Sequence, residues 1–358
     1  MPLKENRIKI IDSLRGIAAL IVVFHHFMVF NSNEIQPIVN YNLWSLLLFL
    51  SDLNIEAVLF FFIISGFCIG LSLKGTLPIK RSSLNNYLIK RFKRILPIYF
   101  ISLMIAFLSG LVMNKLSWDN SFSFINLAGN LLFLQTPISV AHWFSPYGDN
   151  GPLWSLSYEM FFYLFFPLFS FFFIKSAIKN LYLITSLLSI ITIVCLTFNH
   201  YLSFLPWFSF LSLFIIWYFG YILCQYYTLN KRNHTFFALV FTISTVNCFY
   251  KSLILSDSLY LVFKGLIMAS MFYFFICIYQ MKRFGVLKKV EQIINFLFYK
   301  IGKGSYMLYV SHYITLILCN FYHLNIYKTT VALFFNILIS IKLEALIHQF
   351  IYRTKSAH

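Results

Sequence analysis

Charged side chains are scarce in this sequence. They make up 11% of the 358 residues, and Asp and Glu together number only 11, whereas about 25% of the residues in a soluble globular domain are charged. The chain therefore has too little polar surface for a soluble or an intrinsically disordered protein. In place of charge stand 60% hydrophobic residues, with 44 Phe and 23 Tyr. This composition predicts a protein embedded in a lipid bilayer.

Cysteine is also rare, and its placement excludes two kinds of site. All six cysteines lie within apolar segments and none belongs to a CxxC pair, so we expect neither a disulfide framework nor a bound metal. The first apolar stretch ends without a small-x-small cleavage site, which argues against a cleaved signal peptide. No repeat, linker or low-complexity region divides the chain. We therefore expect residues 1–358 to form a single transmembrane domain with no appended soluble domain.

Ten apolar segments are long enough to cross a bilayer, which takes about 17 to 25 residues. They lie at residues 10–30, 55–73, 95–114, 153–174, 181–198, 204–227, 235–250, 258–281, 304–322 and 329–350. A further apolar run at 41–50 is short and is expected to be interfacial or re-entrant. The predicted fold class is all-α, a polytopic transmembrane helix bundle with about ten spans.

The basic residues indicate the orientation of this bundle. With the N-terminus in the cytoplasm, 23 of the 28 Lys and Arg residues fall in or beside inner segments. This positive-inside bias predicts that both termini are cytoplasmic. The net charge of +17 then reflects topology and contact with membrane lipids, and no nucleic-acid partner is expected. The sequence carries no signal for an oligomeric state.

Ionisable residues inside predicted spans are the first candidates for a functional site, because a charged group at bilayer depth is costly. The first span carries four of them, the fourth span carries Glu159 and the ninth carries His312. Cations near the ends of the less certain spans are explained by snorkelling. The complete set is Asp12, Arg15, His25, His26, Glu159, Lys264, His312, Lys342, Glu344 and His348.

Arg15 and His26 fall on one face of the first span. Their separation of 11 residues corresponds to about three helical turns plus 20°, and to about 16 Å along the axis. One stripe thus carries a cation near the cytoplasm and an imidazole in the outer half. His26 is therefore interpreted as functional. His25 points about 100° away and is expected to be a packed or interfacial histidine.

Two further motifs each allow two interpretations. Arg91 and Arg94 share a helix face at the entry to the third span. They form either a topology-determining cluster that faces lipid phosphates or a bidentate phosphate site. Ser155 and Glu159 lie one turn apart on the fourth span. Glu159 either holds a histidine in its correct tautomer or forms a structural ion pair with a cation such as Arg15.

These residues also belong to motifs that resemble a known family. Five motifs occur in order: IDSLRGIAA at 11–19 followed by His26, FFIISGF at 61–67, RxxRILP at 91–97, GPLWSLSYEMFFY at 151–163 and GSYxLYxxH at 304–312. Together they resemble the acyltransferase 3 family of integral membrane O-acyltransferases. Departures are mild: His25 adds a second histidine beside His26, and Tyr158 and Met160 flank the glutamate.

The resemblance implies a ten-span bacterial cytoplasmic (inner) membrane protein. It would move an acyl group, usually acetyl from acetyl-CoA, to a hydroxyl of an extracytoplasmic glycan such as lipopolysaccharide O-antigen or another surface polysaccharide. Carried over by motif, His26 is the essential histidine and Arg15 its partner. Arg91 and Arg94, with Arg15, are the candidates for coenzyme A phosphates, and Glu159 is the motif carboxylate. His312 also follows the pattern, and Asp12 lies within the first motif.

On this interpretation coenzyme A binds at the inner arginines, and its pantetheine arm runs outward toward His26. His26 acts either as general base or as a transient acyl carrier. Oxyanion donors are sought among the hydroxyl groups of Ser65, Ser155, Ser157 and Tyr309. Outside the membrane, an aromatic-rich loop can stack on sugar faces; it contains His142, Trp143, Phe144, Tyr147 and Trp154.

Two other classes of protein compete with the enzyme. A transporter or flippase of a lipid-linked sugar or an anionic solute also has about ten spans and buried Arg, His and Glu. The sequence lacks the matching Gly/Pro-interrupted spans in two halves that are typical of such folds. A non-catalytic receptor is the third class, and it predicts that His26→Ala leaves the phenotype intact.

Overall fold

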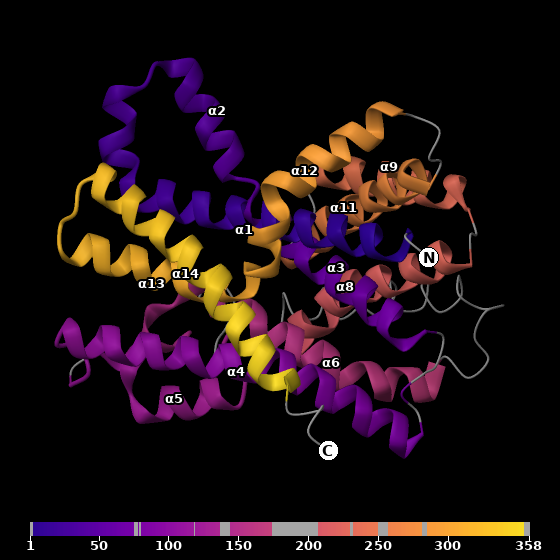
Figure 1. The fold of residues 1–358 in the computed structure, drawn as a ribbon, viewed down its shortest axis with the longest axis horizontal. Coiled ribbons are helices and arrows are strands. Elements are labelled where there is room, and N and C mark those ends of the chain that lie inside the picture. Colours follow the sequence, from indigo (N-terminus) through magenta and orange to yellow (C-terminus); the bar gives the residue numbers. More distant parts are fainter. Residues whose placement is uncertain are drawn as a thin grey trace.

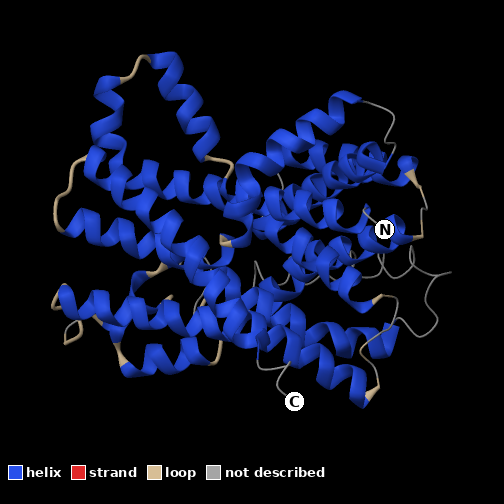
Figure 2. Cartoon of the chain, viewed as in Figure 1, coloured by secondary structure: helices blue, strands red, loops and turns tan. Residues whose placement is uncertain are grey.

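The computed structural model describes residues 3–74, 78, 80–117, 119–136, 144–173, 207–229, 232–249, 257–280 and 285–353. Within these ranges the chain is helical, and the β-structure is limited to one isolated bridge between Gln135 and Phe144 (Figure 2). The all-α prediction is confirmed for this part of the chain.

Each of the nine predicted spans that fall in the described ranges coincides with a helix (Figure 1). These helices are α1 (Leu3–Ile35), α3 (Asn54–Leu73), α4 (Arg81–Val112), α6 (Trp154–Phe173), α8 (Trp207–Thr228), α9 (His234–Phe249), α11 (Asp257–Gln280), α13 (Ser305–Phe321) and α14 (Ile326–Arg353). The fifth predicted span, 181–198, lies outside the described residues.

Among the residues that the structure describes, five helical segments are long and apolar enough to cross a membrane: residues 9–38, 41–73, 81–112, 260–280 and 326–351. The chain is therefore a multi-pass membrane protein by these criteria. The count of ten spans and the cytoplasmic position of both termini stay predictions.

Three helices were not expected as spans: α2 (Tyr41–Ser51), α5 (Phe124–Leu131) and α12 (Gly285–Lys303). α2 is the short apolar run that the sequence placed at the interface. α12 is a 19-residue amphipathic helix where the sequence indicated only a positively charged inner segment. Short 3-10 helices complete the fold at Gln36–Ile38, Asn120–Phe122, Tyr147–Asp149 and Gly151–Leu153.

Glycines let α3 and α8 pack with their backbones in contact. A Cβ added at Gly66 would overlap the backbone oxygen of Trp217, and one at Gly220 would overlap that of Ile63. Small residues allow this close approach of membrane helices. The packing fixes α3, and with it Ser65, against α8.

Glycines also allow close backbone packing between α1 and α12. A Cβ at Gly16 would meet the backbone oxygen of Phe298 at 2.6 Å, and one at Gly302 would overlap the backbone oxygen of Asp12. The hydroxyl of Ser13 also donates a hydrogen bond to Asn295 Oδ1 at 2.7 Å. α12 is therefore a fixed part of the bundle beside the inner half of α1.

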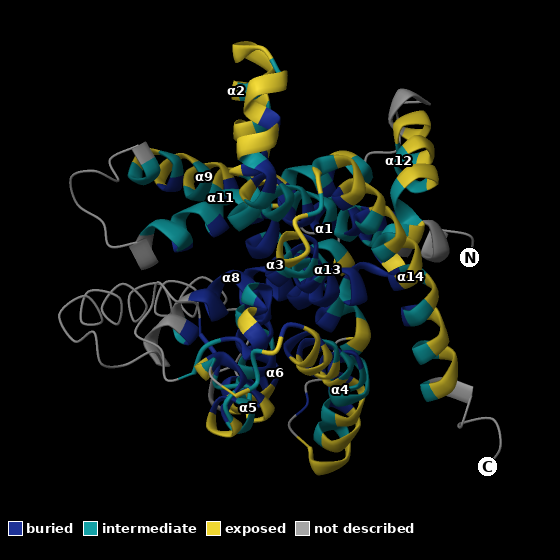
Figure 3. Cartoon of the chain, turned by 90° about the vertical axis from the view of Figure 1, so that its left-hand side faces the viewer, coloured by how far each residue is buried: buried dark blue, intermediate teal, exposed yellow. Residues whose placement is uncertain are grey.

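The buried core lies where α3, α8 and α13 meet, whereas α2 and α12 carry many exposed side chains (Figure 3). Between α6 and α8 the core is aromatic, with Phe162, Phe166, Phe214 and Trp217 all at 1% exposure or less. These rings contact one another at centroid distances of 5.3 to 6.1 Å. The aromatic core holds the inner face of α6, which carries Glu159, toward α3.

Candidate functional site

Two histidines from distant parts of the chain meet between α1 and α13. Nδ1 of His26 lies 3.0 Å from Nε2 of His312. On the other side of the second ring, Nδ1 of His312 lies 3.0 Å from the backbone oxygen of Leu308. His312 is buried with 0% exposure, and His26 is partly buried. Both residues were candidates for the functional site from the sequence, but the contact between them was not predicted.

These hydrogen bonds fix the tautomers of the two neutral rings. A carbonyl oxygen only accepts, so Nδ1 of His312 carries the hydrogen and its Nε2 carries the lone pair. Nδ1 of His26 must then donate to that lone pair. As a result, Nε2 of His26 is an unprotonated nitrogen with no ring partner. A base oriented by a second residue is the arrangement of an acid-base site.

Two neighbours complete the surroundings of His26. The ring of Tyr313 lies edge-on at a centroid distance of 4.8 Å, and the ring of His25 lies at 5.1 Å. Nδ1 of His25 is 3.0 Å from the backbone oxygen of Ser51, at the end of α2. His25 thus ties α1 to α2, which is a packing contact of the kind the sequence favoured for it.

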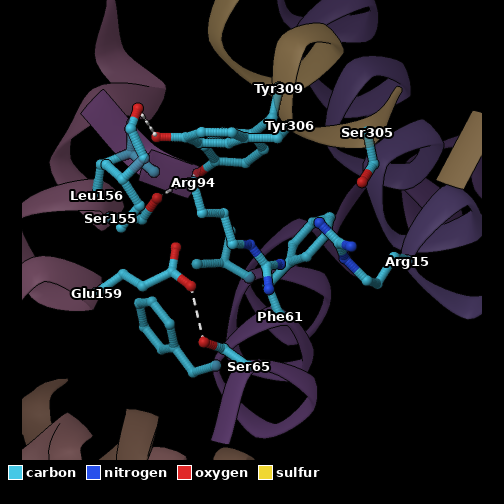
Figure 4. Close-up of a pocket in the computed structure, with 13 residues that line it drawn as sticks. Arg15, Phe61, Ser65, Arg94, Ser155, Leu156, Glu159, Ser305, Tyr306 and Tyr309 are labelled. Atoms are coloured by element: carbon cyan, nitrogen blue, oxygen red, sulfur yellow. Dashed lines mark hydrogen bonds between the residues drawn. The ribbon is translucent and has the colours of Figure 1, made fainter. Parts of the chain in front are cut away.

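A cavity of about 50 Å³ lies on the Arg15 side of the histidine pair, between α1, α3, α4, α6 and α13 (Figure 4). Its walls combine apolar residues with a small set of charged and hydroxyl groups. They are formed by Arg15, Val58, Phe61, Phe62, Ser65, Arg94, Ile95, Ser155, Leu156, Glu159, Ser305, Tyr306 and Tyr309.

Glu159 is held at one wall by hydroxyl groups. Ser65 Oγ and the Tyr163 hydroxyl both donate to Oε1 of Glu159, at 2.7 and 2.6 Å. Nε1 of Trp217 in turn donates to Ser65 Oγ at 3.2 Å. The second oxygen of Glu159 faces the cavity (Figure 4). Tyr163 follows Glu159 by one turn, a spacing that the sequence analysis did not use.

Glu159 does not contact His26. The sequence allowed two interpretations, an orienting acid for the histidine or an ion pair with a cation such as Arg15, and the structure shows neither a contact with His26 nor an ion pair with Arg15. His312 occupies the position beside His26 Nδ1, and the ion-pair partner of Arg15 is Asp12, with Nη1 to Oδ1 at 3.7 Å. Glu159 instead places a negative charge at the cavity wall opposite two arginines.

Those two arginines are Arg15 and Arg94, and their guanidinium groups face each other across the cavity (Figure 4). Arg91 does not line it. Its side chain is 7% exposed and lies over the rings of Tyr87 and Tyr163, with centroid distances of 5.9 Å to each. The structure therefore brings Arg94 together with Arg15 rather than with Arg91, although Arg91 and Arg94 are one turn apart.

Tyr309 connects the cavity to the histidine pair. Its hydroxyl lies 2.8 Å from Ser155 Oγ in the cavity wall, and its ring lies 6.1 Å from that of His312. Of the hydroxyl groups proposed as oxyanion donors, those of Ser65, Ser155 and Tyr309 line the cavity. Ser157 does not, because its Oγ donates to the backbone oxygens of Gln135 and Trp154.

Three of the remaining intramembrane ionisable residues, Lys264, Glu344 and His348, have structural partners. Nζ of Lys264 is 2.6 Å from Oε1 of Glu56, so an ion pair explains its position better than snorkelling. Oε2 of Glu344 accepts the backbone N–H of Met307 at 2.9 Å, in the first turn of α13. Glu344 thus caps the helix that carries His312, with His348 Nε2 3.8 Å from its other oxygen.

One residue of the aromatic loop, Tyr147, does not present the surface that the sequence suggested. Tyr147 is 2% exposed and packs against Phe122 at a ring distance of 5.6 Å, so it offers no face to a sugar. The sequence overestimated it because aromatic composition does not distinguish stacking platforms from packed rings. His142 and Trp143 lie outside the described residues.

Comparison with known proteins identifies a family to which the sequence is similar. Residues 8–344 match a family described as an acyltransferase domain. The chain is 29% identical over 181 residues to Acyltransferase MdmB of Streptomyces mycarofaciens, an alignment that covers 47% of this chain and 40% of that protein. The match thus spans less than half of that relative. No solved structure matches the chain.

Proposed function

Because the chain belongs to the acyltransferase 3 family, we propose that it transfers an acyl group from acyl-coenzyme A to a hydroxyl group of an extracytoplasmic glycan. The observation that carries this proposal is the unprotonated Nε2 of His26, which its hydrogen bond to His312 leaves as the free base of the site.

The cavity supports an anionic donor on the inner side of His26. Two guanidinium groups and one carboxylate line it, so it is electropositive before any ligand binds. Arg15 lies 11 residues before His26, which is about 16 Å along the helix axis. We propose that Arg15 and Arg94 attract the polar end of coenzyme A, and that Glu159 positions Arg94. The pantetheine arm then runs outward to present the thioester at His26.

The chemistry follows from the tautomer of His26. Nε2 removes the proton of the acceptor hydroxyl while the hydroxyl oxygen attacks the thioester carbonyl carbon. The carbon–sulfur bond then breaks, and the proton passes from His26 to the departing thiolate. Hydroxyl groups of Ser155 and Tyr309 are placed to donate to the developing oxyanion.

A second route uses the same lone pair. Nε2 of His26 attacks the thioester, carries the acyl group and passes it to the acceptor in a later step. Incubation with radiolabelled acetyl-CoA in the absence of acceptor distinguishes the two routes. The general-base route leaves the protein unlabelled, whereas the carrier route leaves label on His26.

The acceptor that we propose is a surface polysaccharide, such as lipopolysaccharide O-antigen, at the bacterial cytoplasmic membrane. The support is the family membership and the multi-pass character of the chain. A transporter or flippase of a lipid-linked sugar is the second candidate, favoured by the buried ion pairs of the bundle. Acceptor-dependent release of free coenzyme A separates the two, because a transporter releases none.

The test uses the protein in proteoliposomes with radiolabelled acetyl-CoA inside and envelope polysaccharide outside. We expect label in the polysaccharide with the wild type and loss of about 100-fold or more with His26→Ala. His25→Asn is the matched control, because an amide in place of Nδ1 keeps the hydrogen bond to the backbone oxygen of Ser51. Label transfer by His26→Ala at the wild-type rate would contradict the proposal.

A further inference from the structure

A second cavity lies at the outer ends of α1 and α13, near the turn into α14. Its volume is about 140 Å³, and this turn is at the left edge of Figure 1. Unlike the first cavity, its walls are mainly polar. They are formed by Phe30, Asn31, Glu34, Leu316, Cys319, Asn320, His323, Leu324 and Thr329.

This outer cavity lies farther along the two helices that carry the histidine pair. On α1, Phe30 and Glu34 follow His26 by one and two turns, and on α13, Leu316 and Asn320 follow His312 in the same way. The cavity is therefore displaced outward from the pair by about 6 to 12 Å. The ring of Tyr313 contacts both the histidine pair and the outer cavity. Its centroid lies 4.8 Å from that of His26 and 5.5 Å from that of Phe30.

Two polar side chains of the outer cavity each have an oxygen atom that can accept a further hydrogen bond. Asn31 is 6% exposed, and the hydrogen bond described for its side chain runs from Nδ2 to the backbone oxygen of Phe27. This leaves the amide oxygen of a buried side chain at the cavity. Oε2 of Glu34 accepts the backbone N–H of Ile326 at 2.9 Å, which leaves Oε1 as an acceptor. The buried amide oxygen of Asn31 and the exposed carboxylate oxygen of Glu34 can accept hydrogen bonds from donors such as hydroxyl groups.

The two cavities differ in charge. Two guanidinium groups face the inner cavity, whereas the lining of the outer cavity has no Lys or Arg and contains one carboxylate. An anion is favoured in the first and disfavoured in the second. Hydroxyl donors, amide groups and one aromatic ring are a combination suited to an uncharged polyol.

We propose that the outer cavity binds one uncharged sugar ring of the acceptor and directs a hydroxyl group of that ring past Tyr313 to Nε2 of His26. This inference rests on the proposed acyl transfer and deepens it, because it assigns the acceptor site and its preference for neutral over acidic sugars. Glu34 and Asn31 accept hydrogen bonds from ring hydroxyls, and Phe30 contacts an apolar face of the ring.

A labelling experiment tests this binding without measuring acyl transfer. Leu324→Cys is introduced at a cavity-lining, partly exposed position that leaves Glu34 and Asn31 in place, and a membrane-impermeant maleimide is applied to the outer side of intact cells, with the wild type as background. A panel of neutral methyl hexosides, deoxyhexosides and pentosides serves as the probe. We expect at least one to slow labelling of Leu324→Cys severalfold, and sodium glucuronate to have no effect.

Asn33→Cys is the control, since Asn33 is an exposed residue of α1 near the cavity that does not line it. Its labelling should not change with any sugar. Equal labelling of Leu324→Cys with and without every neutral glycoside would overturn the proposal. Protection by glucuronate but not by neutral sugars would overturn the assigned preference.

A kinetic experiment on the reconstituted full chain separates this inference from the proposed function. Asn320→Ala removes a cavity amide from a helix that accepts alanine well. Glu34→Gln removes the charge but keeps an oxygen for Ile326. Each should raise the acceptor KM about tenfold and leave the acetyl-CoA KM unchanged, whereas Asn33→Ala should change neither. Wild-type transfer with unchanged acceptor KM in both variants overturns the acceptor site alone; no wild-type transfer to any glycan overturns the proposed function.

Discussion

His26 Nδ1 and His312 Nε2 are 3.0 Å apart, although the two residues are separated by 286 positions in the chain. Because His312 is anchored to the backbone oxygen of Leu308, it accepts a hydrogen bond from His26 and does not compete with it for a proton. In the proposed mechanism, the second histidine therefore orients the first during proton transfer.

Substitution of His312 should lower the rate of transfer without removing the base. His312→Phe fills the space but gives His26 no acceptor, and we expect kcat to fall about 10- to 100-fold, as for other residues that orient a reacting group. His312→Gln places an oxygen near the former Nε2 and should recover part of this loss. Steady-state kinetics at matched protein levels measure both effects. Equal activity of the two variants would show that hydrogen bonding to His26 is not the role of His312.

The two arginines of the third-span motif should behave differently. Arg94 lines the inner cavity and Arg91 lies against tyrosine rings outside it. We expect Arg94→Gln to raise the KM for acetyl-CoA about tenfold or more, because a charged hydrogen bond contributes about 1.5 to 3 kcal/mol. Arg91→Gln should instead lower the amount of folded protein and leave that KM unchanged. Measuring KM and thermal unfolding for both variants tests the assignment, and a raised KM in Arg91→Gln alone would reverse it.

Substitutions of the glycines in the sequence motifs should differ in their effect on stability, because these glycines differ in how closely they are packed. Gly66→Ala places a methyl group on the backbone oxygen of Trp217, and such overpacking costs about 1 to 3 kcal/mol or more. Gly151→Ala is the matched comparison, because its Cβ would meet the ring of Tyr313 at an ordinary 3.6 Å. Thermal unfolding in detergent should therefore detect a loss of stability in Gly66→Ala and little change in Gly151→Ala. Equal stability of the two variants would mean that α3 and α8 can move apart at little cost.

Much of the fold could be predicted because hydropathy alone locates apolar helices. Seven of the nine helices found at predicted spans begin and end within a few residues of those predictions, whereas α1 and α4 begin 7 and 14 residues before the predicted spans. α12 was missed because lysines interrupt its apolar residues, so that no segment reaches the hydropathy of a span. Its amphipathic period was the available signal.

The sequence predicted many of the residues that form the site but not how these residues are arranged in space. Helical spacing places residues on a face, yet the three positions from Arg91 to Arg94 still turn by about 60°, which is enough to put one in a cavity and the other outside. The pairs His26–His312 and Ser65–Glu159 join different helices. Such contacts depend on tertiary packing, which local spacing does not encode.

The exposed face of α12 leads to the last prediction, which concerns the membrane. Val290, Ile293, Phe296 and Leu297 are 45 to 86% exposed, and lysines lie before and after them at 288, 289, 300 and 303. An amphipathic helix of this kind lies in the plane of the interface, with its apolar side chains among the lipid chains and its lysines at the headgroups.

Spin labels attached to cysteines at two positions test this placement in liposomes. Leu297→Cys lies on the apolar stripe, and Gln292→Cys lies about 140° away around the helix. We expect the label at 297 to be more accessible to oxygen than to a water-soluble nickel complex, and the label at 292 to show the reverse, after subtraction of the wild-type signal. If both labels were equally accessible to the nickel complex, α12 would stand in water, and its apolar stripe would need another protein surface to cover it.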